Sequence, residues 1–395
     1  MVGYRVGSFE HQSMHLAGLV LFSILCCFWI LQAFRIGRGA LRLPHLKDQS
    51  PCESFPSVSL IFAARDEQEK LPRALATLAK IDYPALEIIA VDDRSTDATS
   101  SILDQAAERD PRFKVVRVES LPEGWLGKPH ALQKAYGIST GEWLLFTDAD
   151  VCFKPDALER AVGMAQSMGL DHLTLMGDVE MHGFWEKTVL TFFALGFYIG
   201  TNPAAVSDAN SSAYLGVGAF QLLKRSAYEA SGTHRRLAME VVDDLKLGKI
   251  VKRAGFRSGV GLAGDYVSVR WHSGVRNIVR GVTKNFFAVA GFSVGAVALQ
   301  VLGIFCTNLL PFVAMPFTHG PTRTLAAVSL MLALAVHAGT ARVMKASGWY
   351  ALTQPLGAAI FAYMLIRSTV VTLKQGGVSW RDTFYPLDQL RRGMV

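Results

Sequence analysis

The sequence predicts an α/β domain with a mostly parallel central sheet, placed between membrane helices at the two ends of the chain. From Val58 to about Gly264, short apolar runs alternate with stretches of helical periodicity, as in sheets whose strands are connected through helices. Residues 1–35 and 286–395 are instead crowded with apolar side chains. The 395 residues are enough for a sizeable core without disulfide support.

The charge distribution favours a membrane surface as the partner of this chain. Hydrophobic residues make up 50% of the sequence, and 40 Lys and Arg against 33 Asp and Glu give a net charge of +7. Many cations stand beside the apolar segments, which suits anionic lipid. No basic stripe interleaved with aromatic residues is present, so we expect no nucleic-acid partner. The cations are Arg35, Arg38, Arg42, Lys47, Arg276, Arg280 and Lys284.

Residues 1–43 are predicted to be a membrane anchor. Leu16 to Phe34 is almost entirely apolar and long enough to cross a hydrocarbon core of about 30 Å as one helix. A cleaved signal peptide is the competing interpretation, but no small-x-small cleavage site follows. Cations concentrate after the stretch, with only Arg5 and histidines before it, so we expect the next residues on the cytosolic side of a bacterial-type inner membrane. Residues 44–56, with three prolines, are predicted to be a linker.

Residues 57–270 are predicted to form the α/β domain. Each predicted strand ends at polar or acidic residues, and open α/β sheets bind their ligands at that edge. The predicted strands are Val58–Ala63, Glu87–Val91, Lys114–Val118 and Glu142–Thr147, and the predicted helices are Glu67–Lys80 and one that begins near Asp97.

The chain becomes apolar again after Lys284. Residues 271–290 are predicted to lie at the membrane interface, residues 291–373 to form transmembrane helices, and residues 374–395 to be a cytosolic tail. The apolar stretch 286–317 is too long for one simple pass and short for two, so the number of passes stays open.

The most specific polar motif is Asp148-Ala149-Asp150, directly after a predicted strand. Alternate residues at a strand end reach the same ion. Hard cations such as Mg²⁺ or Mn²⁺ take carboxylate oxygens and leave positions for phosphate. Solvated loops also contain isolated Asp-x-Asp motifs, but this one follows a buried strand. We therefore expect a divalent metal at Asp148 and Asp150.

Two further polar clusters, Ala64-Arg65-Asp66-Glu67 and Asp92-Asp93, follow the first two predicted strands. Carboxylates in such positions accept hydrogen bonds from a ribose hydroxyl or a base N–H. Asp97, in contrast, is explained by capping of the next helix. Three strand ends are thus expected to aim acids at one crevice.

Asp243-Asp244 precedes the helical run Leu245–Arg253. Adjacent acids at a helix start are often only partners of the helix macrodipole. Beside a metal site, one carboxylate also suits a general base that takes the proton of an attacking hydroxyl while cations stabilise a leaving diphosphate. Upstream, the loop Gly124–Lys128 combines glycines with one cation and suits a phosphate or sugar as well as a plain turn.

These motifs, in this order and roughly this spacing, resemble family 2 glycosyltransferases with the GT-A fold. The resemblance covers about residues 56–290. Within the family, the chain looks most like membrane-bound enzymes that act on lipids, such as hopanoid-associated and carotenoid glycosyltransferases. This narrower likeness is carried by Gly124-Trp125-Leu126-Gly127-Lys128, Gly232-Thr233-His234, Arg270-Trp271 and Lys284-Asn285.

The resemblance implies a nucleotide-sugar donor. Asp93, together with Asp92, would bind the base or ribose. Asp150 would coordinate the metal that bridges the diphosphate, and Asp148 would help to hold the ribose or the metal. The other residues implied in the donor site are Ala64, Arg65, Glu67 and Lys128.

The resemblance also implies that Asp244 is the catalytic base. Asp243 stands where the family usually has Glu. Processive members carry Gln or Arg three residues before their Arg-Trp pair, and this chain has Val267 there, so a processive enzyme is disfavoured. The segment Trp380–Tyr385 resembles a C-terminal motif of the lipid-acting relatives, which implies a tail near the active site and an even number of passes before it.

The predicted function is an inverting, metal-dependent transfer of a hexose from a nucleotide diphosphate sugar to a hydroxyl or carboxyl of a membrane lipid or isoprenoid. One alternative is a processive polysaccharide or glycan synthase. Another is a catalytically impaired membrane protein that binds nucleotide sugars, which the unusual Asp243 would fit. A transporter is disfavoured because few polar groups stand inside the apolar stretches.

Overall fold

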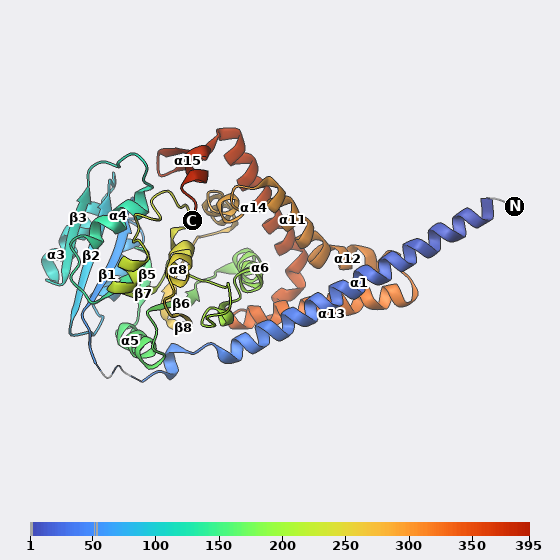
Figure 1. Cartoon of the computed structure of the whole chain (residues 1–395), viewed down its shortest axis with the longest axis horizontal. Helices are drawn as coiled ribbons and strands as arrows, with labels where there is room; N and C mark the ends of the chain where they lie inside the picture. The colour runs from blue at the N-terminus through green and yellow to red at the C-terminus, as the bar shows by residue number, and fades with distance from the viewer. Residues whose placement is uncertain (1–2, 51, 53) are drawn as a thin grey trace. The chain divides into compact units, whose positions relative to one another are not determined.

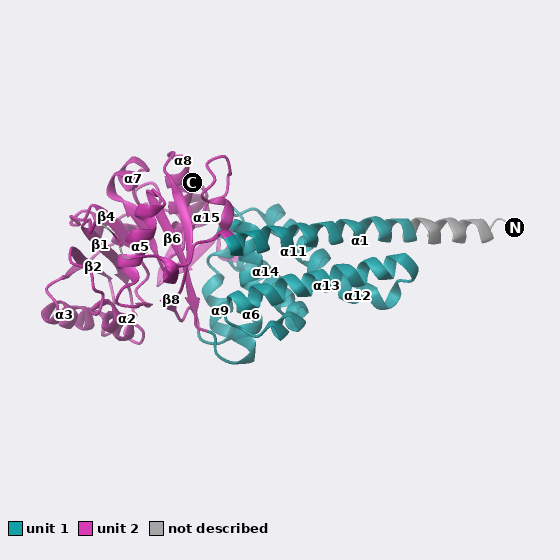
Figure 2. Cartoon of the chain, turned by 90° about the horizontal axis from the view of Figure 1, so that it is seen from below, with its two compact units in different colours: residues 1–41, 181–202, 273–371 teal, residues 42–180, 203–272, 372–395 magenta. Residues whose placement is uncertain are grey.

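The computed structural model of the protein describes residues 3–50, 52 and 54–395, with side chains from His15 onward. It divides into two compact units, coloured separately in Figure 2. Pro51 of the predicted linker and the side chain of Arg5 lie outside the described residues. The helical unit comprises Met1–Leu41, Met181–Asn202 and Ser273–Val371, and the sheet unit comprises Arg42–Glu180, Pro203–His272 and Thr372–Val395.

Within its described residues, the sheet unit contains one eight-stranded sheet (Figure 1). The strands are β1 Val58–Ala64, β2 Leu86–Asp93, β3 Phe113–Val118, β4 Trp143–Phe146, β5 Val151–Phe153, β6 His172–Val179, β7 Gln221–Lys224 and β8 Ser258–Val269. Their order is β3-β2-β1-β4-β7-β6-β8-β5. The pairs of β1 with β2 and β4, of β2 with β3 and of β6 with β8 are parallel, whereas β7 and β5 pair antiparallel. The predicted mostly parallel sheet is confirmed.

Helices cover both faces of the sheet because its central strands are apolar on both sides. In β1, Leu60 and Phe62 belong to one core cluster and Ile61 to the opposite one. The covering helices are α2 Leu71–Leu78, α3 Thr99–Arg109, α4 Gly127–Tyr136, α5 Ala157–Ser167, α7 Arg225–Ala230 and α8 Asp243–Arg253. The first cluster receives α2, α3 and α5, and the second receives α4, α7 and α8.

The helix predicted from Glu67 begins only at Leu71, so that boundary was wrong. The backbone N–H of Glu67 donates to Thr99 Oγ1 at 2.8 Å, and that of Gln68 donates to Asp97 Oδ2 at 3.1 Å. Side chains that follow β2 bind these two N–H groups. The residues before Leu71 therefore connect the segment after β1 to the segment after β2 and do not form the first turn of α2. Asp97 Oδ1 also accepts from the first N–H of α3 at 2.9 Å, which confirms its expected place at the helix start.

The helical unit contains α1 Gly3–Arg42, α6 Gly183–Thr201, α9 Val275–Val282, α10 Phe286–Val289, α11 Val294–Ile304, α12 Leu310–Ala314, α13 Gly320–Val343 and α14 Gln354–Gln375. The described residues include four segments long and apolar enough to span a membrane: His15–Arg42, Val294–Phe317, Gly320–Val343 and Gly348–Gln375. The stretch 286–317 is interrupted at Gly291 (φ +66°) and Phe292 (φ +51°). It therefore contains one candidate span.

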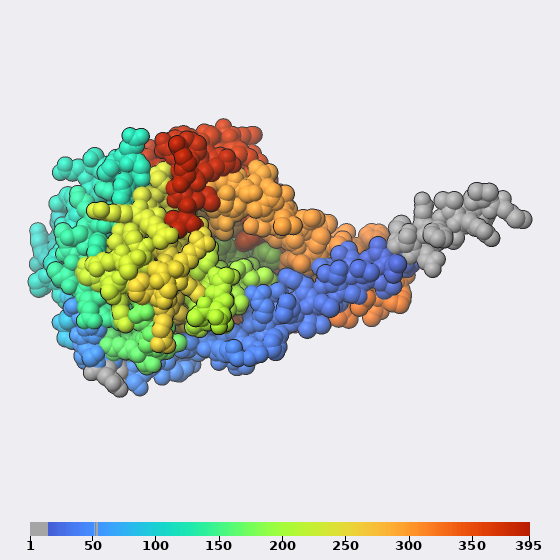
Figure 3. All heavy atoms as spheres, viewed as in Figure 1, coloured from blue at the N-terminus to red at the C-terminus, as the bar shows by residue number. Residues whose placement is uncertain are grey.

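The last residues of the chain belong to the sheet unit. They form β9 Gly377–Trp380 and β10 Thr383–Pro386, an antiparallel hairpin, followed by α15 Leu387–Arg392. Figure 3 shows the end of the chain, in red, lying against the yellow segment around α8. There the N–H of Val395 donates to Glu240 Oε2 at 3.1 Å, and its carbonyl oxygen accepts from Lys246 Nζ at 2.8 Å.

Glu87, at the start of β2, connects β1, β3 and the residues just before β4. Its carboxylate accepts from Ser59 Oγ at 2.5 Å, from the N–H of Thr140 at 2.6 Å and from Lys114 Nζ at 2.6 Å. Burial opposes the charged form, but the hydrogen bonds from Lys114, Ser59 and Thr140 outweigh it and lower the pKa of Glu87 to about 2. The ionised side chain therefore stabilises the sheet.

We expect Glu87→Gln to lower the Tm of the full chain in detergent by several degrees at pH 7. Charge-assisted hydrogen bonds of this kind each stabilise a fold by roughly 1.5–3 kcal/mol. The pKa is lowered on folding, so the stabilisation is complete above the ordinary Glu value of 4.5 and is lost as the pH falls toward about 2. The difference in Tm between wild type and Glu87→Gln should therefore become smaller as the pH is lowered.

Glu108→Gln, on the exposed side of α3, is the matched control for this thermal measurement and should leave the Tm unchanged. Equal Tm values for wild type and Glu87→Gln at pH 7, or a gap that widens in acid, would contradict the role of Glu87.

Candidate active site

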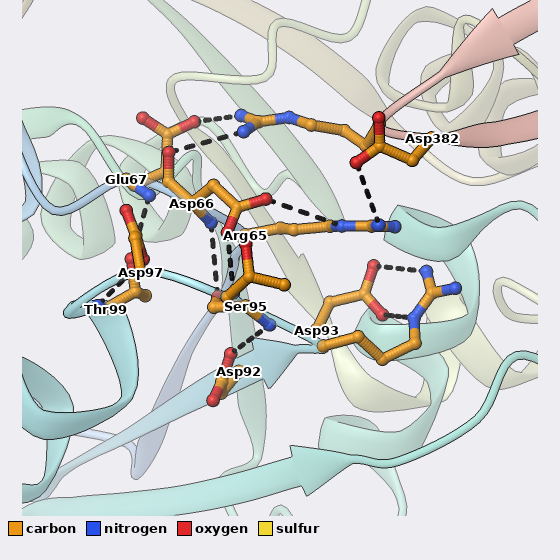
Figure 4. Close-up of polar contacts among 12 residues, drawn as sticks. Arg65, Asp66, Glu67, Asp92, Asp93, Ser95, Asp97, Thr99 and Asp382 are labelled. Carbon is orange, nitrogen blue, oxygen red and sulfur yellow. Dashed lines mark hydrogen bonds and ion pairs between the residues drawn. The ribbon is translucent and has the colours of Figure 1, made fainter.

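The loops that follow β1 and β2 are hydrogen-bonded to each other (Figure 4). Asp66 Oδ1 accepts from the N–H of Thr96 at 2.8 Å, and the N–H of Asp66 donates to Ser95 Oγ at 3.2 Å. Asp66 (φ +53°) and Arg94 (φ +61°) both have left-handed backbone conformations, which non-glycine residues adopt at a cost and often at functional sites. The two motifs predicted from the sequence thus form one hydrogen-bonded edge of the sheet.

Asp92 and Asp93 are both buried, yet their partners differ. Asp92 accepts from the N–H of Ser95 at 3.1 Å and from the hydroxyl of Ser100, so its carboxylate holds the loop together. Asp93 is paired with Arg94 through two bonds, from Nε at 2.8 Å and from Nη2 at 3.1 Å. A side-chain partner can be exchanged for a ligand at less cost to the fold than backbone bonds, so Asp93 is the better candidate for nucleotide binding.

Lys128, in the first turn of α4, brings the Asp-x-Asp motif and the start of α8 together. Its Nζ donates to Asp148 Oδ1 at 2.6 Å and lies 4.0 Å from Asp243 Oδ2. Burial disfavours the ammonium, but the carboxylates of Asp148, Asp243 and Asp244 outweigh that effect and raise the pKa of Lys128. Lys128 is therefore a permanent cation among three acids.

Asp150, the other acid of the motif, has a lysine partner of its own. Lys70 Nζ donates to Asp150 Oδ2 at 2.7 Å and also to the carbonyl oxygen of Trp271 at 3.3 Å. Burial and the charge of Asp148 raise the pKa of Asp150, and Lys70 acts in the opposite direction. The backbone of the Arg270-Trp271 pair therefore reaches the edge where the Asp-x-Asp motif lies.

The side chains of Asp244 and Asp148 both lie next to Gly218. Asp244 Oδ2 accepts from the N–H of Gly218 at 3.1 Å, and Asp244 Oδ1 accepts from the N–H of Leu245 at 2.8 Å. A Cβ at Gly218 would lie 2.6 Å from Asp148 Oδ2 and 3.1 Å from Asp244 Oδ2. Glycine is thus required for these two carboxylates to approach each other.

A small pocket opens among these groups. His234, one of its lining residues, is bonded through Nδ1 to the Tyr228 hydroxyl at 2.6 Å. Burial and the charge of Lys128 lower the pKa of His234 to about 3, so this ring stays neutral and adds no cation. The residues that line the pocket are Lys128, Leu132, Phe146, Thr147, Gly218, Gln221, His234, Asp243, Asp244 and Leu247.

The side chains of Glu67 and Arg65 face charged residues of the C-terminal hairpin. The side chain of Ala64 has no polar group with which to bind a ligand. Burial raises the pKa of Glu67, the charge of Arg381 opposes that effect, and Asp150 adds to it. Arg65 Nη2 lies 3.9 Å from Asp382 Oδ2. Ala64 is the buried last residue of β1, so it can only position the polar residues after it.

The carboxylates of Asp148 and Asp150 fit a divalent metal that arrives with phosphate ligands. Both are hard oxygen donors, and 41% and 17% of their side-chain surfaces are exposed. Among the described residues, no group of three or more His, Cys, Asp or Glu is arranged to hold an ion by itself. Mg²⁺ commonly takes one or two carboxylates and completes its shell with water and substrate phosphates. Two neighbouring aspartates, Asp148 and Asp150, match that habit.

Sequence reasoning found the acids of the site but missed most of their partners. Lys70, Arg94 and Gly218 each contact a predicted site residue. Arg381 does so too, and its segment Trp380–Tyr385 was expected near the site, although no role was assigned to the arginine itself. Nothing in the sequence pairs a given lysine or arginine with a given acid. The Gly216-Val217-Gly218 segment was the one local signal available for a close backbone approach.

A family model, Glycosyl transferase family 2, matches residues 59–232. The match contains the motifs after β1, β2 and β4 and ends shortly before Asp243-Asp244. The candidate site residues between Arg65 and Gly218 therefore lie in a region that matches family 2 glycosyltransferases, and Asp243 and Asp244 lie just beyond it. The resemblance stated from the sequence is confirmed.

Two curated relatives act on lipid-like molecules according to their names. The 4,4'-diaponeurosporenoate glycosyltransferase of Staphylococcus haemolyticus is 25% identical over 236 residues, 59% of this chain and 62% of that protein. The beta-monoglucosyldiacylglycerol synthase of a Synechocystis strain is 31% identical over 174 residues, 42% of this chain and 36% of that protein. The matched region thus spans less than two thirds of either relative.

Among solved structures, the mannosyltransferase PcManGT of Pyrobaculum calidifontis, determined with GDP-Man and Mn²⁺, resembles this chain in fold. The TM-score is 0.55 at 21% identity, over 91% of this chain and 99% of that one. This similarity confirms the predicted GT-A fold of the sheet unit.

We expect Gly218→Ala to abolish the thermal stabilisation of the full chain by a nucleoside diphosphate with Mn²⁺. The new Cβ has to displace Asp148 and Asp244, and a ligand that binds only the folded state raises its stability in proportion to its affinity. Gly339→Ala, at a glycine whose Cβ would meet open space, should behave as wild type. An undiminished ligand-induced shift in Gly218→Ala would show that the two carboxylates do not need this approach.

Proposed function

We propose that the protein transfers a hexose from a nucleotide diphosphate sugar to a hydroxyl or carboxyl of a membrane lipid or isoprenoid, with inversion at the anomeric carbon. The observation that carries this proposal is the meeting of Asp148 and Asp244 at Gly218, with Lys128 between Asp148 and Asp243. This arrangement puts the donor-binding motif and a base of suitable chemistry in one place.

Residues at both ends of the polar sheet edge support a nucleotide diphosphate sugar as the donor. Asp93 and Arg94 offer an acceptor and a donor to a base or ribose, and Lys70 and Lys128 offer charge to a diphosphate. The fold neighbour from Pyrobaculum binds GDP-Man, which is a donor of this class.

Asp148 and Asp150 would hold Mg²⁺ or Mn²⁺ together with the donor. Bound there, the ion would supply positive charge to the diphosphate as it leaves. The fold neighbour was determined with Mn²⁺. The remaining positive charge comes from the chain itself, through the ammonium groups of Lys70 and Lys128.

Asp244 would act as the general base. In the transfer, the acceptor oxygen forms a bond to the anomeric carbon while the bond from that carbon to the phosphate oxygen breaks, and the acceptor proton passes to a carboxylate oxygen of Asp244. The N–H of Gly218 fixes that carboxylate. Asp243, buried and 4.0 Å from Lys128, would keep the lysine charged and in place.

The acceptor class follows from the apolar segments and the relatives. Four segments of the described chain are long and apolar enough to span a membrane, which favours an amphiphilic acceptor delivered in the bilayer. The names of the two curated relatives, a carotenoid-type and a diacylglycerol-type glycosyltransferase, support the same class.

The points at which the chain leaves and re-enters the sheet unit constrain its membrane topology. The chain leaves the sheet unit after residue 272 and returns at residue 372, so the number of membrane crossings between them has to be even if this polar unit lies on one side of the bilayer. Three candidate spans occur in that interval. We infer that α11–α12 and α13 cross as a pair, and that α14, which has Arg367 in its interior, does not cross.

We expect Asp244→Asn to lower turnover by about two to four orders of magnitude, the usual contribution of a general base, while donor binding is retained. The measurement is transfer of label from a nucleotide sugar into extracted lipid by membranes that contain the full chain. Asp208→Asn, an exposed acid away from the site, is the control. Unchanged turnover in Asp244→Asn would mean that Asp244 is not the base.

The topology predicts how single cysteines react with a membrane-impermeant maleimide in sealed vesicles. Ser347→Cys and Gln375→Cys, at the two ends of the α14 region, should label from the same side as Lys47→Cys in the sheet unit. His319→Cys, between α12 and α13, should label from the opposite side, and wild type gives the background of the native cysteines. Labelling of Gln375→Cys together with His319→Cys would show that α14 crosses.

A further inference from the structure

We propose that the β9–β10 hairpin forms a wall of the donor site and that Arg381, at its turn, binds the diphosphate of the donor. The inference rests on the proposed nucleotide-sugar donor. It adds a phosphate-binding residue from the C-terminal segment, which lies well outside the 59–232 match to the family model.

The turn of the hairpin is built to present two charged side chains. Arg381 (φ +49°) and Asp382 (φ +62°) link β9 to β10 in the left-handed conformations that a two-residue hairpin turn requires. Asn and Gly are the residues that adopt this turn most easily, so an Arg-Asp pair costs stability here. Such strain is most often kept where the side chains have a task.

The charged side chains of the turn contact the loop after β1. The Arg381 guanidinium donates to the carboxylate of Glu67 and to the carbonyl oxygen of Asp66. Figure 4 shows the Asp382 carboxylate directed at Arg65, 3.9 Å from its Nη2. The arginine of the hairpin turn thus faces a carboxylate of the predicted donor site, and the aspartate of the turn faces an arginine of that site.

The hairpin extends along the polar edge from Glu67 toward Gly127. Tyr385 of β10 is buried, and the backbone of Gly127 and the side chains of Asp93 and Arg94 are close enough to act on it electrostatically. At the other end, the carboxylate of Glu67 that Arg381 holds is within the electrostatic reach of Asp150 and Lys70. Tyr385 is therefore at the nucleoside end of the proposed site and Arg381 at the diphosphate end.

Arg381 retains the capacity for a second anion. A guanidinium has five N–H donors in a planar fork that matches phosphate oxygens, and the bonds to Glu67 and Asp66 use only two of its nitrogens. About a third of the side chain, 36%, is exposed. A diphosphate beside Asp150 and Lys70 would meet this open side of the guanidinium.

The test is calorimetric titration of the full chain in detergent with UDP, GDP and dTDP, each with Mn²⁺, followed by the parent nucleoside of whichever diphosphate binds. We expect Arg381→Ala to weaken diphosphate binding by about tenfold or more, the effect of losing one charge-assisted contact, and to change nucleoside binding less than about threefold. Arg392→Ala, an exposed arginine of the same tail that is paired with Asp388, should bind both ligands as wild type does.

Each outcome decides between the two proposals. Equal diphosphate affinity in wild type and Arg381→Ala overturns the role of Arg381 and leaves the proposed donor class intact. Equal losses for diphosphate and nucleoside also overturn it, because they indicate a hairpin that has only become misplaced. If wild type binds none of the three diphosphates, the proposed donor class fails, and the role of Arg381 fails with it.

Discussion

The site is governed by the repulsion between carboxylates that a parallel sheet brings to one edge. Asp93, Asp148, Asp150 and the pair at the start of α8 would repel one another strongly in a partly buried crevice if no cations accompanied them. The chain supplies Arg94 to Asp93, Lys70 to Asp150, and Lys128 to Asp148 and Asp243. In this structure, therefore, two lysines and an arginine supply the positive charge that balances the acids.

The structure around this sheet edge allows the backbone to come very close to the acidic side chains. Glycines at positions 127 and 218 leave no room for a Cβ beside Asp93 and Asp148, so the backbone itself sets the spacing of the acids. The loops after β1 and β2 bind each other through backbone and side-chain hydrogen bonds instead of starting their helices early. The C-terminal hairpin closes the same edge with an arginine. Distant parts of the sequence thus contribute to one charge-balanced surface.

The sequence was sufficient for the first four strands and for the acids, but not for β5 to β8 or for the partners of the acids. Apolar runs such as Leu60–Ala63 identify strands because burial on both faces favours apolar side chains at successive positions, and an acid at the end of such a run has to lie at the sheet edge. The start of α2 was misplaced because the N–H groups of Glu67 and Gln68 are bound by side chains that follow β2, a long-range contact that local sequence patterns do not reveal. For the same reason, Lys70 and Gly218 become site residues only in three dimensions.

The charge balance has a direct consequence for metal binding. Because Lys70 and Lys128 already neutralise Asp150 and Asp148, Mn²⁺ alone should find little attraction, whereas a nucleoside diphosphate would draw the lysines to its phosphates and free the carboxylates. The decisive measurement is titration of the full chain with Mn²⁺ in the absence and presence of a saturating nucleoside diphosphate, corrected for Mn²⁺ binding by the free nucleotide. We expect the Mn²⁺ affinity to be at least about tenfold higher when the diphosphate is present. Equal affinity in the two titrations would contradict this expectation.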